Sequence, residues 1–338
     1  MAKWQPFKMV SMISLVLIFV FVAAGSVAAV EQSLYARLLF SDEKLRVAAV
    51  KELHETFNTM SSEQKKQLFT ELILATAQVG TKDGSQPYNS GKAMTALAEI
   101  GTPAVPFFIQ YLEQDLNPNP SDFPAYLSDL SPASLRVLTR GLTITVLGRI
   151  RPPAIEAVPL LVKILREEKN PSAAQALGEI GVATPEVINA IQEVLQGADD
   201  RLSVMILTAE ALRKLGVKPQ PRQEMIGELF EQLQGKNVLE NPNEIYSQMD
   251  VAHALLLLGA HKKESIQVLL DGMDKIPGTK VIEIIRELGP IAKETVPKLV
   301  EKLHEEYYPV AIIEALRCIG TPEALKAVNE YEQQVKIK

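Results

Sequence analysis

The side chains of this 338-residue sequence that could do chemistry include four histidines and a single cysteine. Two histidines precede a glutamate, in His54-Glu55 and His304-Glu305, and such pairs can supply nitrogen and oxygen ligands to a metal ion. His253 lies among apolar residues in VAHALLLLG, and we predict that it is a structural histidine at a helix surface. These residues predict a catalytic or metal site only if the fold brings them together.

Other catalytic signatures do not occur in the sequence. It has no G-x-S-x-G, P-loop, C-x-x-C, H-E-x-x-H or glycine-rich dinucleotide motif. Cys318 lies in the run IEALRCIG, where we predict a small buried side chain, with a reactive or partner-linked thiol as the alternative. Carboxylate pairs such as Glu167-Glu168 stand near lysines and are predicted to lie on solvated helix faces. We therefore expect no enzymatic activity, no cofactor and no metal ion.

The strongest pattern in the chain is a repeated unit of two helices. In residues 277–303, apolar side chains recur at helical spacing on both sides of Gly289-Pro290, which predicts a helix, a tight turn and a second helix. Neither helix could bury its apolar stripe alone, so like units are expected to stack on both sides. The predicted turn positions of the successive copies are Gly101, Arg151, Gly181, Gly216, Gly259, Gly289 and Gly320.

Several predicted helices begin with a capping sequence. Thr102, Thr184 and Thr321 each precede a proline, which favours a threonine N-cap with proline at the first helical position. Ser61 and Gln64 have the spacing of a capping box.

Two blocks of residues resemble a known repeat family. One is a small residue followed by Leu, two variable residues, Ile or Leu, and Gly; the other is Ala-Val-Pro or Thr-Val-Pro at 104–106, 157–159 and 295–297. Both resemble HEAT repeats, and more narrowly the bacterial HEAT-like repeats first named for phycobilisome lyases. The resemblance covers roughly residues 41–335. It implies an all-α fold, a right-handed α-α superhelix of about eight helix pairs, which we expect to form one continuous solenoid over residues 30–338.

The resemblance carries little information on function, because these repeats serve many unrelated purposes. Deoxyhypusine hydroxylase, a HEAT-type enzyme, holds iron with His-Glu pairs on equivalent helices. Here His54 lies near the end of a predicted first helix and His304 near the end of a predicted second helix, so the two pairs are not expected to converge on one metal centre. An accessory lyase-like activity of the bilin lyase kind is the alternative function. It would require a tetrapyrrole and a cytoplasmic phycobiliprotein partner, and a purely structural spacer is a third possibility.

Residues 1–29 have the composition of an export signal. Lys3 and Lys8 flank the start of an uncharged stretch, residues 9–30, and the small residues Ser-Val-Ala end at Ala28. This pattern predicts either a signal peptide cleaved after Ala28 or an uncleaved anchor formed by residues 9–30. In both cases the basic residues stay in the cytoplasm, so we expect the body of the protein in the periplasm or elsewhere outside the cytoplasm.

The charge of the chain argues against nucleic acid as a partner. The whole sequence carries −6, and without residues 1–29 it has 33 basic and 41 acidic side chains, a net charge of about −8. We expect an exported, non-enzymatic scaffold or adaptor whose partners are other proteins of the cell envelope. Contact with the membrane is expected only through the N-terminal segment, if that segment is uncleaved.

Three inserted loops, residues 80–91, 115–131 and 235–246, connect one predicted repeat to the next and are expected to project from the same edge. Aromatic residues are common where partners dock, although each could instead pack onto its own repeat. The predicted partner-binding residues in or beside the loops are Tyr88, Phe123, Tyr126 and Tyr246. An acidic run around 222–231 could meet a basic partner segment, with a plain solvated helix face as the alternative.

Overall fold

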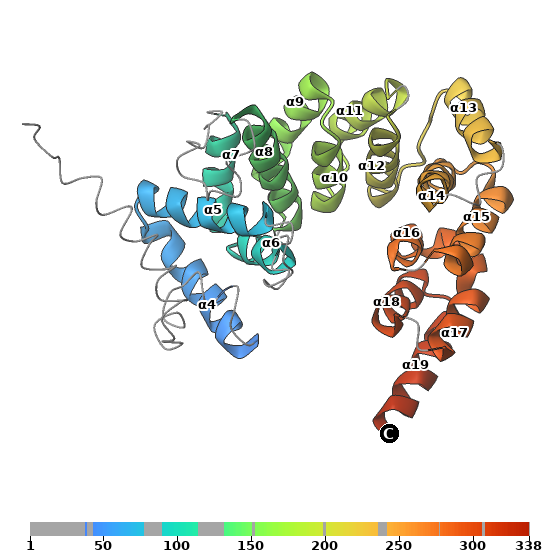
Figure 1. Ribbon diagram of the computed structural model, residues 1–338. Coiled ribbons are helices and arrows are strands. Elements are labelled where there is room, and N and C mark those ends of the chain that lie inside the picture. The colour runs from blue at the N-terminus through green and yellow to red at the C-terminus, as the bar shows by residue number, and fades with distance from the viewer. Residues whose placement is uncertain are drawn as a thin grey trace, which may run out of the picture. The chain divides into compact units, whose positions relative to one another are not determined.

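The structure is a computed structural model that describes residues 38, 43–77, 90–113, 132–150, 153–198, 201–235, 242–276, 278–305 and 308–337. Within these residues the chain is helical and forms no strand (Figure 1). The predicted all-α class is therefore confirmed. None of the helices in these ranges combines the length and apolarity that a bilayer span needs, and the predicted leader lies outside them.

The described helices form eight pairs, each with a first helix, a turn and a second helix, as the repeat pattern predicted. The first helices are α4 (Glu43–Thr56), α6 (Ser90–Glu99), α8 (Pro132–Arg149), α10 (Pro171–Ile180), α12 (Leu202–Lys214), α14 (Pro242–Leu258), α16 (Lys280–Leu288) and α18 (Pro309–Ile319). The second helices are α5 (Ser62–Ala77), α7 (Val105–Glu113), α9 (Val158–Glu168), α11 (Pro185–Gln196), α13 (Gln223–Gln234), α15 (Lys262–Lys275), α17 (Val296–His304) and α19 (Pro322–Ile337). Short 3-10 turns lie at η1 (Phe57–Thr59), η2 (Thr102–Ala104), η5 (Ile155–Ala157) and η7 (Gly289–Thr295).

The chain divides into two compact units, Met1–Leu160 and Leu161–Lys338, and the boundary lies inside α9. The core of unit 1 contains an aromatic cluster. The ring of Phe69 lies 5.4 Å from that of Phe108 and 4.7 Å from that of Tyr111, which joins α5 to α7. The single continuous solenoid over residues 30–338 stays a prediction.

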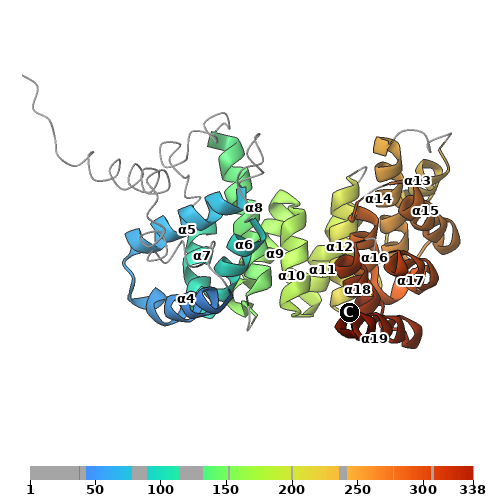
Figure 2. The same ribbon diagram turned by 60° about the horizontal axis from the view of Figure 1, so that its bottom comes forward.

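In unit 2 the first and second helices form two rows. Figure 1 shows α14, α16 and α18 beside α13, α15, α17 and α19, and in the rotated view of Figure 2 α10, α11 and α12 stand side by side. Neighbouring first helices run in the same direction, as two contacts between their C-terminal ends indicate. Gly178 near the end of α10 lies against Ala211 near the end of α12, and Gly289 lies against the backbone of Cys318 at the end of α18.

The glycines predicted at the turns have positive φ angles. A positive φ is strained for side chains with a Cβ atom, so glycine ends these helices without that cost. The φ values are 76° at Gly101, 81° at Gly181, 76° at Gly216, 78° at Gly259, 54° at Gly289 and 69° at Gly320. The seventh predicted turn position, Arg151, lies outside the described residues.

Three of the predicted caps are confirmed. The Ser61 amide donates to the Gln64 side chain at 2.9 Å, and the Gln64 amide donates to Ser61 Oγ at 3.2 Å, which is a complete capping box. The hydroxyl of Thr184 accepts a backbone hydrogen bond at 3.3 Å, and that of Thr321 accepts one at 3.2 Å.

The cap predicted at Thr102 is wrong. The 3-10 turn η2 begins at Thr102 itself, its N-cap is Gly101, and no side-chain hydrogen bond caps it. The glycine already turns the chain, so the threonine becomes the first residue of the turn and its hydroxyl does not reach a free amide.

Candidate interaction surface

The aromatic residues predicted to bind a partner are only partly described by the structure. Tyr88, Phe123 and Tyr126 lie outside the described residues. Tyr246 was predicted in or next to a loop over residues 235–246, but α14 already begins at Pro242. Tyr246 is therefore a half-buried helical residue, and the loop is shorter than predicted.

A second candidate surface follows the first helices. Each first helix with a turn glycine has one residue two positions and another six positions before that glycine. These two residues are four positions apart, so they lie on the same face of the helix. We call the members of this set in unit 2 the first-helix strip; Thr95 and Glu99 are the equivalent positions in unit 1. Two positions before the glycine are Glu99, Glu179, Lys214, Leu257, Glu287 and Cys318. Six positions before it are Thr95, Gln175, Glu210, His253, Glu283 and Glu314.

Cys318 belongs to this strip and is exposed, so its predicted burial is wrong. The run IEALRCIG looks uniformly apolar around the thiol, but the same position carries a charge at Glu179, Lys214 and Glu287. The position also holds the buried Leu257 in α14, so comparing the repeats favours the polar side of the helix for Cys318 without deciding it.

Ion pairs connect neighbouring helices along the strip of unit 2. Lys214 of α12 pairs with Glu179 of α10 and, at 2.6 Å, with Glu210 of its own helix. Partial burial disfavours the charged form of Lys214, but its hydrogen bonds to the two carboxylates outweigh this cost and raise its pKa.

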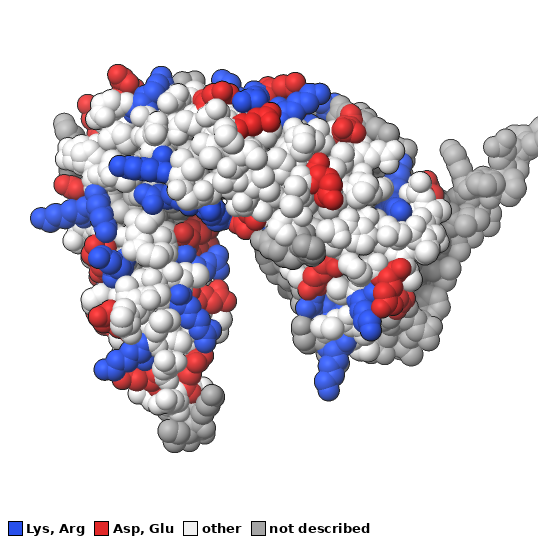
Figure 3. Space-filling model, turned by 180° about the vertical axis from the view of Figure 1, so that it is seen from behind, with Lys and Arg blue, Asp and Glu red and all other residues white. Residues whose placement is uncertain are grey.

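The ion pairs continue toward the C-terminus. Lys280 of α16 lies 3.3 Å from Asp250 of α14, and Arg286 of α16 lies 3.2 Å from Glu314 of α18. Unit 1 has a comparable pair between α4 and α6, Arg46 with Glu99 at 2.7 Å. In Figure 3, basic and acidic side chains are interspersed over unit 2, at the left of the view.

His253 is a buried member of the strip, like Leu257 of the same helix. Its exposed fraction is 2%, so the prediction of a surface histidine is wrong, because α14 packs between α12 and α16. Its Nε2 has no hydrogen-bond partner, and the nearest carboxylate oxygen, Oε2 of Glu287, lies 3.9 Å away, beyond hydrogen-bond distance. Burial, with a smaller contribution from Lys280, lowers the pKa of His253 to about 4, so the ring is neutral at pH 7.

Glu287 has no cationic partner among the described residues. Its side chain is 42% exposed, and its Oε2 lies 3.9 Å from Nε2 of the neutral His253. Burial raises the pKa of Glu287, the charge of Glu210 adds to the increase, and Arg286 and Lys280 act against it. Arg286 and Lys280 are nevertheless paired with other carboxylates, Glu314 and Asp250.

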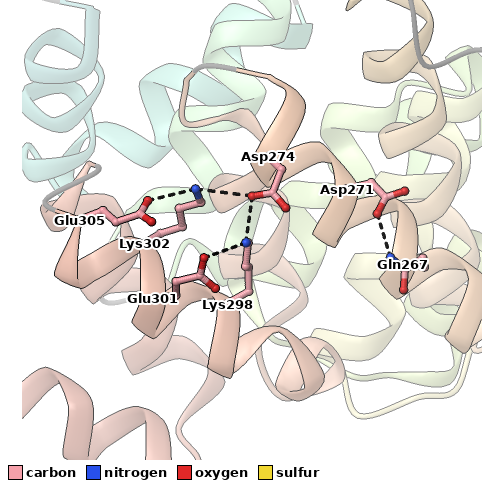
Figure 4. A network of polar contacts seen from close by, with 7 residues as sticks. All are labelled: Gln267, Asp271, Asp274, Lys298, Glu301, Lys302 and Glu305. Atoms are coloured by element: carbon pink, nitrogen blue, oxygen red, sulfur yellow. Dashed lines mark hydrogen bonds and ion pairs between the residues drawn. The ribbon is translucent and has the colours of Figure 1, made fainter.

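The second helices carry their own ion pairs. Figure 4 shows Asp274 of α15 between two lysines of α17, Lys298 at 2.9 Å and Lys302 at 3.5 Å. The same lysines contact Glu301 at 3.0 Å and Glu305 at 3.1 Å. A hydrogen bond from Lys298 lowers the pKa of Asp274, which is a surface effect of paired charges.

The acidic run predicted on α13 is exposed. Glu224, Glu228 and Glu231 all face solvent, and none of them forms an ion pair with a described residue. The neighbouring Phe230 is half-buried and stacks on the ring of His261, with 3.6 Å between the ring centroids.

The two His-Glu pairs lie on non-equivalent helices, as predicted. His54 is in the last turn of α4, a first helix, and His304 ends α17, a second helix. His54 Nδ1 lies 3.0 Å from the carbonyl oxygen of Ile100, which can only accept, so Nδ1 carries the proton. Within the described ranges, no group of three or more His, Cys, Asp or Glu side chains is placed to hold a metal ion.

Comparison with known proteins decides the type of repeat. Residues 172–197 match the family model described as PBS lyase HEAT-like repeat. The chain contains a HEAT-like repeat. The match coincides with the pair formed by α10 and α11, and the HEAT-like turn glycine of that pair is Gly181. Searches of curated proteins and of solved structures found no significant match.

Proposed function

We propose that this protein is an exported, non-enzymatic scaffold that binds other proteins of the cell envelope through its HEAT-like repeats. The observation that supports this most directly is the first-helix strip of unit 2, where polar side chains of α10, α12, α16 and α18 line up, with the buried His253 and Leu257 of α14 between them. A row of parallel helices presents such residues at regular intervals, which suits an extended partner. Export is supported by the sequence of residues 1–29.

The proposal is tested by site-specific photocrosslinking in cells. A photoreactive amino acid is placed at Glu283 or Glu287 of the strip, at Tyr88, Phe123, Tyr126 or Tyr246, and, as the control, at Lys326 of the second helix α19. Lys326 is exposed, so it reports non-specific contacts. We expect discrete crosslinked envelope proteins from the strip or the aromatic positions and none from Lys326. The same pattern of products at every position would contradict a specific scaffold.

The processing state is measured on the same sample. Mass analysis of the N-terminus distinguishes a chain that begins at Ala29 from one that retains residues 1–28. Recovery of the protein in the cytoplasmic fraction with its N-terminus intact would contradict export.

A lyase-like activity is the second candidate, and the name of the matching repeat model favours it. A protein that handles a tetrapyrrole is expected to carry visible absorbance after mixing with bilin and gel filtration. The scaffold proposal predicts that the bilin elutes separately from the protein.

A further inference from the structure

The helix pairs of unit 2 stack through one face of each first helix. The residue three positions before the turn glycine reaches the following pair: Arg213 of α12 donates to the carbonyl oxygen of Leu257 in α14, and Arg286 of α16 lies 3.2 Å from Glu314 of α18. The residue seven positions before the glycine lies on the same face. It is buried at Ala174, Ala209, Ala252 and Ile282. This face is therefore covered in each helix that another described pair follows.

In α18 the same face is exposed. Three positions before Gly320 stands Arg317, whose side chain is 53% exposed and pairs at 2.6 Å with Glu332 of α19, the second helix of its own pair. Ile313, seven positions before the glycine, is only half-buried, and Val310 is 71% exposed. Figure 1 shows α18 and α19 at the end of the two helix rows of unit 2. The face that stacks the earlier pairs is thus open to solvent here.

The exposed face continues onto α19. Leu325 stands seven positions before Glu332 and Val335 three positions after it, so the three side chains share one side of the helix. Leu325 is 43% exposed and Val335 is 55% exposed. Because Glu332 pairs with Arg317, this side of α19 adjoins the exposed face of α18. We call the combined area the end surface; its residues are Val310, Ile313, Arg317, Leu325, Glu332 and Val335.

We propose that two copies of this protein associate through their end surfaces, related by a two-fold axis. The end surface continues the interface that joins the helix pairs of unit 2, so the occupant that fits it is another helix pair. It holds one cation and one anion among apolar side chains. In a two-fold arrangement the same patch meets itself, which lets Arg317 of each copy approach Glu332 of the other.

The distribution of charge also favours a second copy as the occupant. The whole sequence carries a net charge of −6, so two copies repel each other over most of their surfaces. The charges of Arg317 and Glu332 cancel, which makes the end surface a neutral, largely apolar area where this repulsion is smallest. The inference goes beyond the proposed scaffold function and does not depend on it.

The test is the mass of the full chain in solution, measured by sedimentation equilibrium. A reducing agent keeps Cys318 as a thiol, so no disulfide between copies contributes to the mass. We expect the mass to rise from one chain toward two as the concentration increases from about 1 to about 100 μM, because a small interface gives a weak dimer. A mass of one chain throughout this range would overturn the proposal.

A matched pair of valine variants locates the interface. Val310→Asp buries an unpaired carboxylate in the dimer, so the dissociation constant is expected to rise by about tenfold or more. Val137→Asp is the control, because Val137 of α8 is 72% exposed, nearly the same as Val310, and lies in unit 1. Both side chains are exposed, so circular dichroism should show unchanged helicity. Equal dissociation constants for the two variants would overturn the end surface as the interface.

Two charge variants test the symmetry. Arg317→Glu leaves two carboxylates on the end surface and Glu332→Arg leaves two guanidinium groups, so each variant alone is expected to stay at the mass of one chain. An equimolar mixture places opposite charges across the interface and is expected to dimerise. A mixture that does not dimerise would overturn the two-fold pairing. The scaffold proposal is tested separately by its crosslinked envelope proteins and would stand.

Discussion

Gly178 of α10 lies so close to Ala211 of α12 that a Cβ atom at position 178 would be 2.8 Å from the Cα atom of Ala211. The obstacle is backbone, which cannot rotate away as a side chain can. The close approach of α10 and α12, the two most closely packed helices of unit 2, therefore depends on the absence of a side chain at this position.

Gly178→Ala is expected to destabilise unit 2 although alanine is the better helix former. Separating the two helices costs about 1–3 kcal/mol, which exceeds the gain of about 1 kcal/mol from helix propensity. The measurement is the urea midpoint followed by circular dichroism. Gly227→Ala is the matched control, because Gly227 lies in the exposed face of α13 with no atom within 4 Å of the added Cβ. The control is expected to be stabilised, and a stabilised Gly178→Ala would show that the close approach is not required.

Thr184→Ala is expected to lower the stability of unit 2 by about 1 kcal/mol. The substitution removes the hydroxyl that accepts the backbone hydrogen bond at the start of α11. Thr102→Ala is the control, because that threonine also precedes a proline but does not cap its turn. Thermal unfolding of the two variants should therefore differ, and equal losses would contradict the assignment of the caps.

The stability of unit 2 is expected to fall as the pH decreases from about 6.5 to about 4, because of His253. Its pKa is about 4 in the folded state and 6.5 in the unfolded chain, so between these values the unfolded chain binds more protons. The difference corresponds to about 3 kcal/mol that is fully present above pH 6.5 and lost toward pH 4. Urea titrations at several pH values measure it.

Two substitutions separate this effect from that of other groups. His253→Gln is expected to remove most of the dependence between pH 4 and 6.5. Burial raises the pKa of Glu287. Keeping this carboxylate ionised in the folded protein therefore costs stability at pH values above its ordinary pKa of 4.5, and the cost disappears as the pH falls. Glu287 therefore opposes the effect of His253, and Glu287→Gln should make the loss of stability at low pH steeper. A pH dependence that is unchanged in His253→Gln would contradict the burial of the neutral ring.

Cys318 is expected to react with a maleimide in the folded protein. Its side chain is exposed on α18, so native and urea-unfolded samples should label to the same extent, as followed by intact mass. Cys318→Ser is the control, because it leaves no thiol in the chain. Labelling that requires urea would show that the thiol is covered, as the apolar sequence around it first indicated.

The sequence by itself determined the helix pairs, their turn glycines and most of their caps. These features depend on a few neighbouring residues, such as the glycine at 181 that ends α10 with positive φ and the threonine at 184 that caps α11. The repeat resemblance followed from the same local patterns, and the match at residues 172–197 agrees with it.

Only the tertiary structure decided the environment of individual side chains. His253 was predicted at a surface and is buried, Cys318 was predicted to be buried and is exposed, and the helix that contains Tyr246 begins at Pro242, inside the predicted loop. The pairing of Lys280 with Asp250, and the position of His253 beside Glu287, depend on residues about thirty positions apart in the chain. Such contacts are set by how neighbouring repeats pack, and that packing is a property of the stacked helices rather than of any one segment of sequence.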